Sequence, residues 1–268
     1  MNNFHDRYGT HAFIAGSAEG IGAAFAAALA AKEMNLVLAD RDETALSSFI
    51  HDLQKKHAVE ITPLIVDLGE PDAWKTCGEM IREKGCRLMV YNTAFSIVRP
   101  FSALSHEELD LFLSVNNRTM LHLVHDFISQ LKTRKESGGI LLMSSLAGLV
   151  GPRLVAPYAG TKGFINLLGE ALYHELKQDH IDLTVCCAGT TSTPTWQASR
   201  PDLSRLNPGV MEPGKVAEYA IRNLGRKNRC IPGWKNRMQY FMLTHLLPRS
   251  IAASIVSNAM GKLYGRQT

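Results

Sequence analysis

A glycine-rich turn near the N-terminus is the feature that most constrains how this chain can fold. The turn follows a short apolar run from His11 to Ala15 and opens into an alanine-rich segment from Ala23 to Ala31. The apolar run predicts a buried parallel strand, and the alanine-rich segment predicts a helix. A strand, a glycine turn and a helix in this order aim backbone N–H groups and the helix dipole at a pyrophosphate. The order therefore predicts a dinucleotide site.

Each glycine of the turn has an expected task. Gly16 would permit the tight turn, Gly20 the close approach of the backbone to a ligand, and Gly22 the contact between helix and sheet. Because the chain holds 21 glycines in 268 residues, such a pattern alone can arise by chance. Its weight comes from its place at the first strand–helix junction and from a second motif downstream.

The second motif is Tyr158-Ala-Gly-Thr-Lys162, preceded by Ser145 at the end of an apolar run that begins at Ile140. In a helix, a phenol and an ammonium at i and i+4 stand on one face. A strand end presents its side chains to the ligand crevice of an open α/β sheet. A fixed ammonium favours the phenolate of a tyrosine, so these side chains can move a proton on and off an alcohol oxygen.

Together, the two motifs resemble the short-chain dehydrogenase/reductase family in its compact, single-domain form, from about Thr10 to Pro232. The resemblance implies an α/β fold with a three-layer, Rossmann-like, doubly wound parallel sheet of about seven strands. Residues 1–268 would form one domain, with a core over 10–232, a substrate lid over 190–214 and a C-terminal helical tail over 234–266. The alternation of strand and helix patterns along the chain predicts the same parallel sheet.

The elements expected from the patterns are short strands separated by helices. The strands are expected at 11–15, 35–39, 61–66, 88–92, 140–143, 183–187 and 229–231, and the helices at 42–57, 71–83, 105–135, 158–178 and 216–224. Ser105 and Glu108 form a predicted capping box at the start of the helix 105–135.

The resemblance implies an NAD(P)-dependent oxidoreductase that interconverts a secondary alcohol and a ketone. Tyr158 would be the acid and base at the substrate oxygen, and Lys162 would lower its pKa and bind the nicotinamide ribose. Ser145 would bind the substrate oxygen, since the family's spacing from Tyr158 selects it over its neighbour Ser144. Asn116 would hold a relay water, although a surface-facing polar residue is the alternative there.

The same resemblance implies a set of cofactor-binding residues at the carboxyl ends of the strands. They are Gly16, Ser17, Glu19, Gly20, Ile21, Gly22, Asp40, Arg41, Asp67, Leu68, Asn92, Ala94, Tyr158, Lys162, Gly189, Thr191 and Thr193. Two turns depart from the family pattern, because Tyr91-Asn92-Thr93-Ala94 stands for Asn-Asn-Ala-Gly and Ala188-Gly189 stands for Pro-Gly. These departures leave open a protein that binds a dinucleotide without catalysis, as a sensor or scaffold.

The choice of dinucleotide depends on the end of the second strand. The carboxylate of Asp40 can accept both ribose hydroxyls of NAD and would repel the 2′-phosphate of NADP, and Glu19 adds a second negative charge. Arg41 argues the other way, because its guanidinium can pair with that phosphate. Two carboxylates against one arginine favour NAD over NADP.

Composition limits the remaining classes. Five cysteines without disulfide or zinc-site spacing, and no signal sequence or membrane span, predict a cytoplasmic protein. No metal site is expected, since His122 and His125 lack further ligands. A net charge of +4 without an aromatic stacking pattern does not predict nucleic-acid binding. The resemblance implies a homodimer or homotetramer built on the helices that hold Asn116 and Tyr158.

The tail after Pro232 is the least typical part of the chain. Ile251, Ile255, Ala259 and Leu263 form a predicted apolar stripe on a helix. Three destinations remain open for the tail: packing over the substrate cleft, an interface between subunits, or the headgroup layer of a membrane, which is not favoured. With the lid and its Trp196, this tail suggests a small-molecule alcohol or ketone that is apolar, steroid-like or acyl-like.

Overall fold

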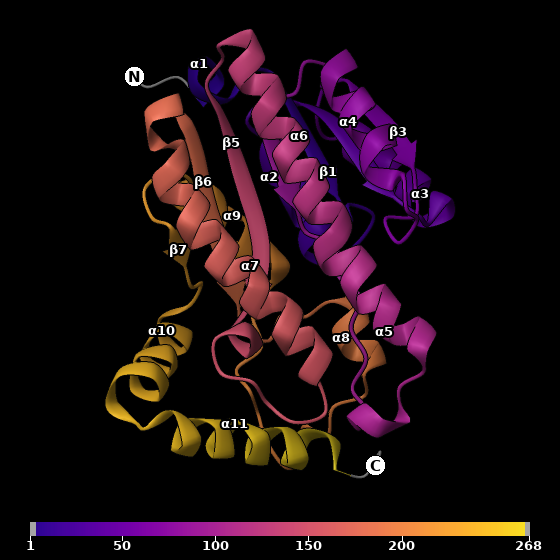
Figure 1. The fold of residues 1–268 in the computed structure, drawn as a ribbon. Coiled ribbons are helices and arrows are strands. Elements are labelled where there is room, and N and C mark those ends of the chain that lie inside the picture. The colour runs from indigo at the N-terminus through magenta and orange to yellow at the C-terminus, as the bar shows by residue number, and fades with distance from the viewer. Residues whose placement is uncertain (1–3, 266–268) are drawn as a thin grey trace.

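The computed structural model describes residues 4–265, and in them one parallel sheet of seven strands organises the chain (Figure 1). The strand order is β3-β2-β1-β4-β5-β6-β7. The strands are β1 (His11–Ala15), β2 (Asn35–Asp40), β3 (Ile61–Ile65), β4 (Leu88–Tyr91), β5 (Gly138–Ser145), β6 (Ile181–Ala188) and β7 (Arg229–Cys230). The predicted fold class, a doubly wound parallel α/β sheet of about seven strands, is confirmed.

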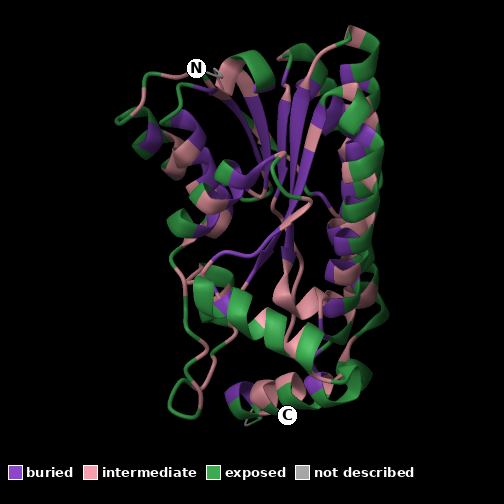
Figure 2. Ribbon diagram, turned by 90° about the vertical axis from the view of Figure 1, so that its left-hand side faces the viewer, coloured by how far each residue is buried: buried purple, intermediate pink, exposed green. Residues whose placement is uncertain are grey.

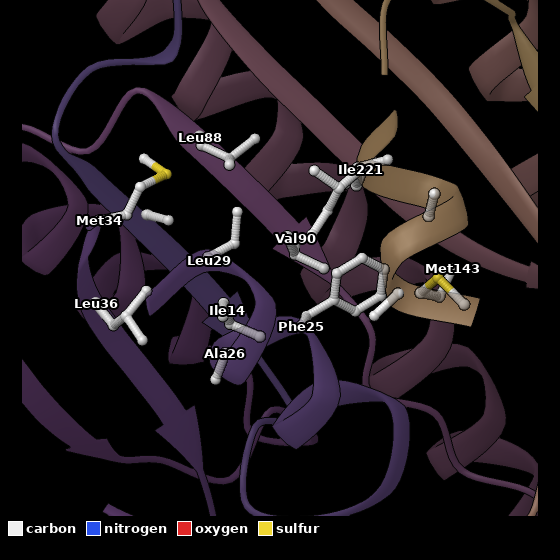
Figure 3. Close-up of a cluster of buried hydrophobic side chains, with 14 of the residues drawn as sticks. Ile14, Phe25, Ala26, Leu29, Met34, Leu36, Leu88, Val90, Met143 and Ile221 are labelled. Carbon is white, nitrogen blue, oxygen red and sulfur yellow. The ribbon is translucent and has the colours of Figure 1, made fainter. Parts of the chain in front are cut away.

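Alternation along the strands builds one apolar core on each face of the sheet. On β1, Ile14 belongs to one core and Phe13 to the other, as expected when successive side chains point to opposite faces. On β4, Val90 and Met89 divide in the same way. Figure 3 shows the first core, in which Phe25 lies among side chains from several strands and from a distant helix.

Helices cover both cores and make the three layers (Figure 1). One face carries α2 (Gly20–Ala30), α3 (Glu43–Gln54) and α9 (Pro213–Asn223). The other carries α4 (Ala73–Glu83), α6 (Thr119–Arg134) and α7 (Ala156–Glu175). The short helices α1 (Phe4–Tyr8), α5 (His106–Leu113) and α8 (Pro194–Ala198) lie outside this layering. In Figure 2 the strands are buried, and the outer faces of the helices are exposed.

The helix expected over 105–135 is interrupted. A π-helical turn over Ser114–Arg118 separates α5 from α6. The hydroxyl of Tyr91, a buried residue of β4, donates to the carbonyl of Val115 in this turn, 2.7 Å away. The capping box at its start is confirmed, since Ser105 accepts from the Glu108 amide and the Glu108 carboxylate accepts from the Ser105 amide. The predicted helix was continuous because both sides of the π turn are helical, and such a turn occurs as a single turn within an α-helix.

The crevice expected of an open α/β sheet lies beyond the carboxyl ends of β1 and β4. β1 pairs with β2 on one side and with β4 on the other, so the chain leaves β1 and β4 in opposite directions. Such a reversal opens a crevice for a ligand at the strand ends. The glycine turn follows β1 and Asn92 follows β4, which places both at this crevice.

The segment from Thr190 to Met211, within the predicted lid, is closed at its base. Met211 donates its amide to the Thr190 carbonyl, and Ser192 donates to the Met211 carbonyl. The lid also contacts the tail. The backbone amide of Asp202 donates to the Leu263 carbonyl, and the hydroxyls of Ser199 and Tyr264 lie 2.9 Å apart.

The tail consists of α10 (Trp234–Phe241), a π turn (Met242–Leu246) and α11 (Arg249–Tyr264). Figure 1 shows α11 crossing the end of the molecule at which the strands finish. The predicted apolar stripe is only partly buried: Leu263 is 7% exposed, but Ile251 and Ile255 are 48% and 46% exposed. Steps of four residues turn about 40° beyond a full revolution, so the stripe winds around the helix rather than following one face. The predicted end of the tail, residue 266, lies outside the described residues.

We predict that Phe25→Ala lowers the free energy of unfolding by about 3–5 kcal/mol, because it empties a fully buried site in the first core. Urea denaturation would measure the change. The same substitution at Phe101, which is 61% exposed, is the control and should cost under about 0.5 kcal/mol. Equal losses at the two positions would contradict the core assignment.

Candidate active site

The glycine turn is held by a contact between two glycines. Gly16 and Gly20 have φ of +74° and +58°, conformations that L side chains rarely adopt. A Cβ atom at Gly22 would lie 1.7 Å from the Gly16 carbonyl oxygen, so no side chain fits there. Asn92 Nδ2 donates to that same oxygen at 2.8 Å, which ties the turn to the end of β4. The retained asparagine of the altered Tyr91-Asn92-Thr93-Ala94 turn thus positions the loop, and Ala94, which follows in the same turn, is half-buried.

The N-terminus of α2 is free of side-chain caps. Glu19 is the N-cap residue with extended backbone, but its side chain makes no capping hydrogen bond and is exposed, and the first turn holds no acidic residue. The first N–H groups of the helix, around Gly20 and Ile21, therefore remain available to an anion. This arrangement fits a dinucleotide pyrophosphate.

Some predicted cofactor residues present no side chain to the crevice. Ser17 is fully buried and donates its hydroxyl to the Ala39 carbonyl, so it supports the turn from within. Leu68 and Thr191 are 5% and 6% exposed, and the Thr191 hydroxyl donates to the Gly189 carbonyl. These three residues can contribute main-chain atoms or shape to a cofactor site, but not an exposed side chain.

The end of β2 gathers the groups expected to meet an adenosine. Asp40 Oδ2 accepts from the Ala18 amide at 2.9 Å, while Oδ1 accepts from the amides of Arg41 and Asp42. Arg41 and Asp67 line one hollow of about 520 Å³, together with Asp42, Glu43, Ile65 and Val66. The structure therefore brings Asp40, Arg41 and Asp67 to the same end of the crevice.

The lid reaches the glycine turn at Thr193. A Cβ atom placed on Gly20 would lie 3.0 Å from the Thr193 methyl carbon, so the lid and turn are in contact. Thr193 caps α8 by accepting from the Trp196 amide. Gly189 packs against Asn236 of α10, whose amide nitrogen donates to the Pro232 carbonyl.

Ser145, Tyr158 and Lys162 lie together beyond the end of β5. The Ser145 oxygen accepts from the Ala147 amide at 3.2 Å, and Ser145 is close enough to the phenol of Tyr158 to lower its pKa. Lys162 Nζ lies 5.6 Å from the Tyr158 ring centroid and donates to the Met143 carbonyl at 2.8 Å. Ser144 points the other way and donates to the Lys162 carbonyl, as the alternation of strand side chains predicts.

Burial dominates the titration of both groups. Desolvation raises the pKa of Tyr158 above its usual value, and the hydrogen bond from Ser145 opposes this shift. Desolvation lowers the pKa of Lys162 to about 8, because the residue is 2% exposed and no carboxylate within residues 4–265 forms an ion pair with it. Its ammonium lies over the Tyr158 ring and donates to a carbonyl.

Asn116 is buried in the π turn between α5 and α6. Its Oδ1 accepts from the Phe95 amide at 2.7 Å, and Nδ2 donates to the Phe95 carbonyl and to the Thr161 hydroxyl, both at 3.0 Å. The alternative of a surface-facing asparagine is therefore wrong. Its side chain joins the loop after β4 to the helix that carries Tyr158 and Lys162.

Three supporting residues were not predicted. Tyr91 bonds the π turn, Thr161 bonds Asn116, and Asn236 fills the space beside Gly189. Thr161 lies inside the Tyr158–Lys162 motif, so its position offered a signal. Asn236 offered none, because only the folded chain brings α10 next to the turn after β6. Among residues 4–265, no group of three or more His, Cys, Asp and Glu side chains could hold a metal ion.

Comparison with known proteins identifies the family of the chain. The family model for short chain dehydrogenase matches residues 10–204. A 7beta-hydroxysteroid dehydrogenase of Clostridium sardiniense is 28% identical over 235 residues, which cover 88% of this chain and 90% of that protein. A very-long-chain 3-oxoacyl-CoA reductase of Candida glabrata is 26% identical over 262 residues, covering 89% of this chain and 73% of that protein.

Solved structures show the same fold. One from a study of 7beta-hydroxysteroid dehydrogenase stereoselectivity superimposes with a TM-score of 0.85 at 23% identity, over 97% of this chain and 99% of that one. Other short-chain enzymes of this fold have been solved in complex with NADPH.

The chain belongs to the short-chain dehydrogenase family. It is an oxidoreductase of that family, as its named relatives are dehydrogenases and reductases, and the family binds NAD(P). This favours an enzyme over the non-catalytic dinucleotide-binding protein that the altered turns left open.

We predict that Lys162→Met raises the free energy of unfolding at pH 7 by about 2 kcal/mol, because burial of the ammonium is costly. The pKa of Lys162 is lower in the folded chain than in the unfolded one, so this cost is present below pH 8 and disappears as the pH rises toward 10.5. The advantage of the variant should therefore shrink across that window in urea denaturation. A constant difference between pH 6 and pH 10 would contradict a buried ammonium.

Proposed function

We propose that this protein interconverts a secondary alcohol and a ketone by hydride transfer, with its chemistry at Ser145, Tyr158 and Lys162. The observation that carries the proposal is the meeting of these three side chains beyond the end of β5, beside the glycine turn. When bound, the nicotinamide dinucleotide supplies or accepts the hydride, which no side chain can do.

In the proposed mechanism, Tyr158 Oη exchanges a proton with the substrate oxygen. Ser145 can donate its hydroxyl hydrogen to the same oxygen, because its own oxygen already accepts from Ala147. The interaction with Ser145 also lowers the pKa of Tyr158, which favours the phenolate that takes up the proton of the alcohol during oxidation.

Lys162 would lower the pKa of Tyr158 further by placing a positive charge beside the phenolate and would bind the nicotinamide ribose. Its own pKa of about 8 allows it to pass a proton near neutral pH. Asn116 would hold the relay water that leads protons from Lys162 to solvent, since Oδ1 accepts one protein hydrogen bond and retains a second lone pair. Its two bonds to Phe95 would also keep the crevice wall in place.

We infer a preference for NAD over NADP. The Asp40 carboxylate is fixed at the crevice by three backbone amides, so a 2′-phosphate placed there would meet a held negative charge. Arg41 is exposed at the adjoining hollow, where its guanidinium would attract a 2′-phosphate and so oppose the preference for NAD.

The substrate is proposed to be an apolar secondary alcohol or ketone of about steroid size. Similarity to a 7beta-hydroxysteroid dehydrogenase supports a steroid, and similarity to a very-long-chain 3-oxoacyl-CoA reductase supports an acyl chain. Ser96, Leu146 and the lid residue Trp196 are each half-buried and would line its path. The segment 190–214 would act as the lid.

A homodimer or homotetramer is proposed through α5, α6 and α7. Four large apolar side chains stand exposed on these helices: Leu113, Leu121, Phe164 and Leu167. A cytoplasmic location is proposed as well, because the five cysteines are buried free thiols that suit a reducing compartment. No helix within residues 4–265 has both the length and the apolar character to span a membrane.

We predict that Tyr158→Phe lowers kcat by about 10²–10⁴-fold on a responsive substrate, since it removes only the proton-carrying oxygen. Turnover of NAD(H) would be measured on steroid, acyl and small secondary alcohols and ketones. Dinucleotide affinity, measured by titration, should change little. Unchanged turnover in the variant would overturn the assignment of Tyr158.

A second prediction concerns the cofactor. Asp40→Asn should raise kcat/KM for NADPH relative to NADH by about tenfold, because it removes a charge that repels the 2′-phosphate. Arg41→Gln is the matched control, which should lower use of NADPH and leave NADH kinetics nearly unchanged. A wild-type enzyme that prefers NADPH would contradict the inferred role of Asp40.

A further inference from the structure

The tail carries a row of exposed apolar side chains that the active site does not use. We call this surface the tail face. It consists of Trp234, Met238, Phe241, Met242, Leu246, Ile251 and Ile255, each between 46% and 62% exposed. Large apolar side chains scattered singly are ordinary on a protein surface, whereas a continuous group of them marks an interaction site.

The helix geometry explains why the side chains at the start of the tail face share one side. Trp234, Met238 and Phe241 of α10 and Met242, the residue that follows it, are spaced i, i+4, i+7 and i+8, which places them on one face. The opposite face holds the helix to the body: Asn236 is buried beside Gly189, and the Tyr240 hydroxyl accepts from Arg229.

α11 is two-sided in the same way. Ala252 and Leu263 are buried against the body, while Ile251 and Ile255 point outward. Asn258 and Lys262 continue this outer row at helical spacing, and both are exposed. The apolar part of the row thus ends in a basic residue.

All the charged residues of the C-terminal region are basic. The last 50 residues, 219–268, contain nine Lys and Arg and no Asp or Glu, so all 25 acidic residues lie before them. The modest net charge of +4 therefore conceals an acidic body and a basic C-terminal region. Lys235 and Arg249 are exposed within the tail face, and Lys235 Nζ lies 5.8 Å from the Trp234 ring centroid.

We propose that the tail face docks on the surface of a membrane that contains anionic phospholipids. Exposed Trp, Phe, Met and Ile side chains would enter the boundary between headgroups and acyl chains, as in amphipathic helices that lie in the membrane plane. The basic residues would meet the phosphate groups of an anionic leaflet. The sequence pattern of the tail did not favour a membrane. The exposure of its apolar side chains and its lack of acidic residues now favour one.

A second copy of the chain is the rival occupant, and charge disfavours a contact between two tail faces. A contact between two identical tail faces across a two-fold axis would bring basic residues toward basic residues, with no acidic partner in the tail. The exposed apolar side chains on α5, α6 and α7 offer a separate surface for self-association.

Docking would place the membrane beside the substrate side of the enzyme. α11 contacts the loop after β5, where the Arg153 amide donates to Ser257 Oγ, and it contacts the lid through Asp202 and Leu263. An apolar alcohol dissolved in the lipid would then reach the crevice over a short path.

The test is flotation of the full chain with vesicles of phosphatidylcholine alone and of phosphatidylcholine mixed with phosphatidylglycerol. We expect binding to the mixed vesicles only, and its loss at about 1 M salt, where charges are screened beyond about 3 Å. The double variant Phe241→Ser/Leu246→Ser should bind at least about tenfold more weakly, because it removes two inserted side chains. Lys235→Glu/Arg249→Glu should show a similar loss.

Phe101→Ser is the matched control, since this residue is 61% exposed but lies outside the tail face and outside the helices proposed for self-association. It should float like the wild type. Absence of flotation with anionic vesicles, or equal flotation of the tail variants, would overturn the proposal. Size-exclusion chromatography would identify the rival: a wild type that does not float and a tail variant that forms a smaller oligomer would assign the tail face to a second copy.

Discussion

The close approach of α2 to the end of β1 is the constraint on which the site depends. Because Gly22 has no side chain, the helix can begin directly over the Gly16 carbonyl, and Asn92 holds that carbonyl from β4. The turn after β1 and Asn92, which lies 76 residues further along the chain, are thereby joined by a hydrogen bond at the point where the sheet reverses direction. The uncapped N-terminus of α2 then faces the crevice that contains Tyr158 and Lys162.

The sequence predicted most of this architecture because its signals are local. Strand, turn and helix patterns depend on neighbouring residues, and the alternation that separates Ser144 from Ser145 follows from strand geometry alone. Features that depend on contacts across the fold were missed, such as the π turn bonded by Tyr91 and the packing of Asn236 on Gly189. The predicted apolar stripe of the tail does not form one buried face. Its residues are spaced four apart, and each step of four residues turns about 40° beyond a full revolution of the helix.

Lys162 illustrates how a functional residue conflicts with stability. Its ammonium is buried, donates to one carbonyl and has no carboxylate partner, so the fold retains a charged group at a cost. Asn116 shows the opposite arrangement, because it is buried but both ends of its amide hydrogen-bond Phe95 or Thr161. The sequence identified both residues, but it could not show that the ammonium of Lys162 is buried at a cost while the amide of Asn116 is hydrogen-bonded.

The bonds between the lid and the last turn of α11 have a practical consequence. The backbone amide of Asp202 donates to the Leu263 carbonyl, and the Ser199 hydroxyl hydrogen-bonds the Tyr264 hydroxyl. The lid therefore cannot move outward independently of α11. Either these bonds break or the final helix travels with the lid. The last turn of α11 is consequently tied to the segment 190–214, and a truncation that removes this turn would release that segment as well as shorten the helix.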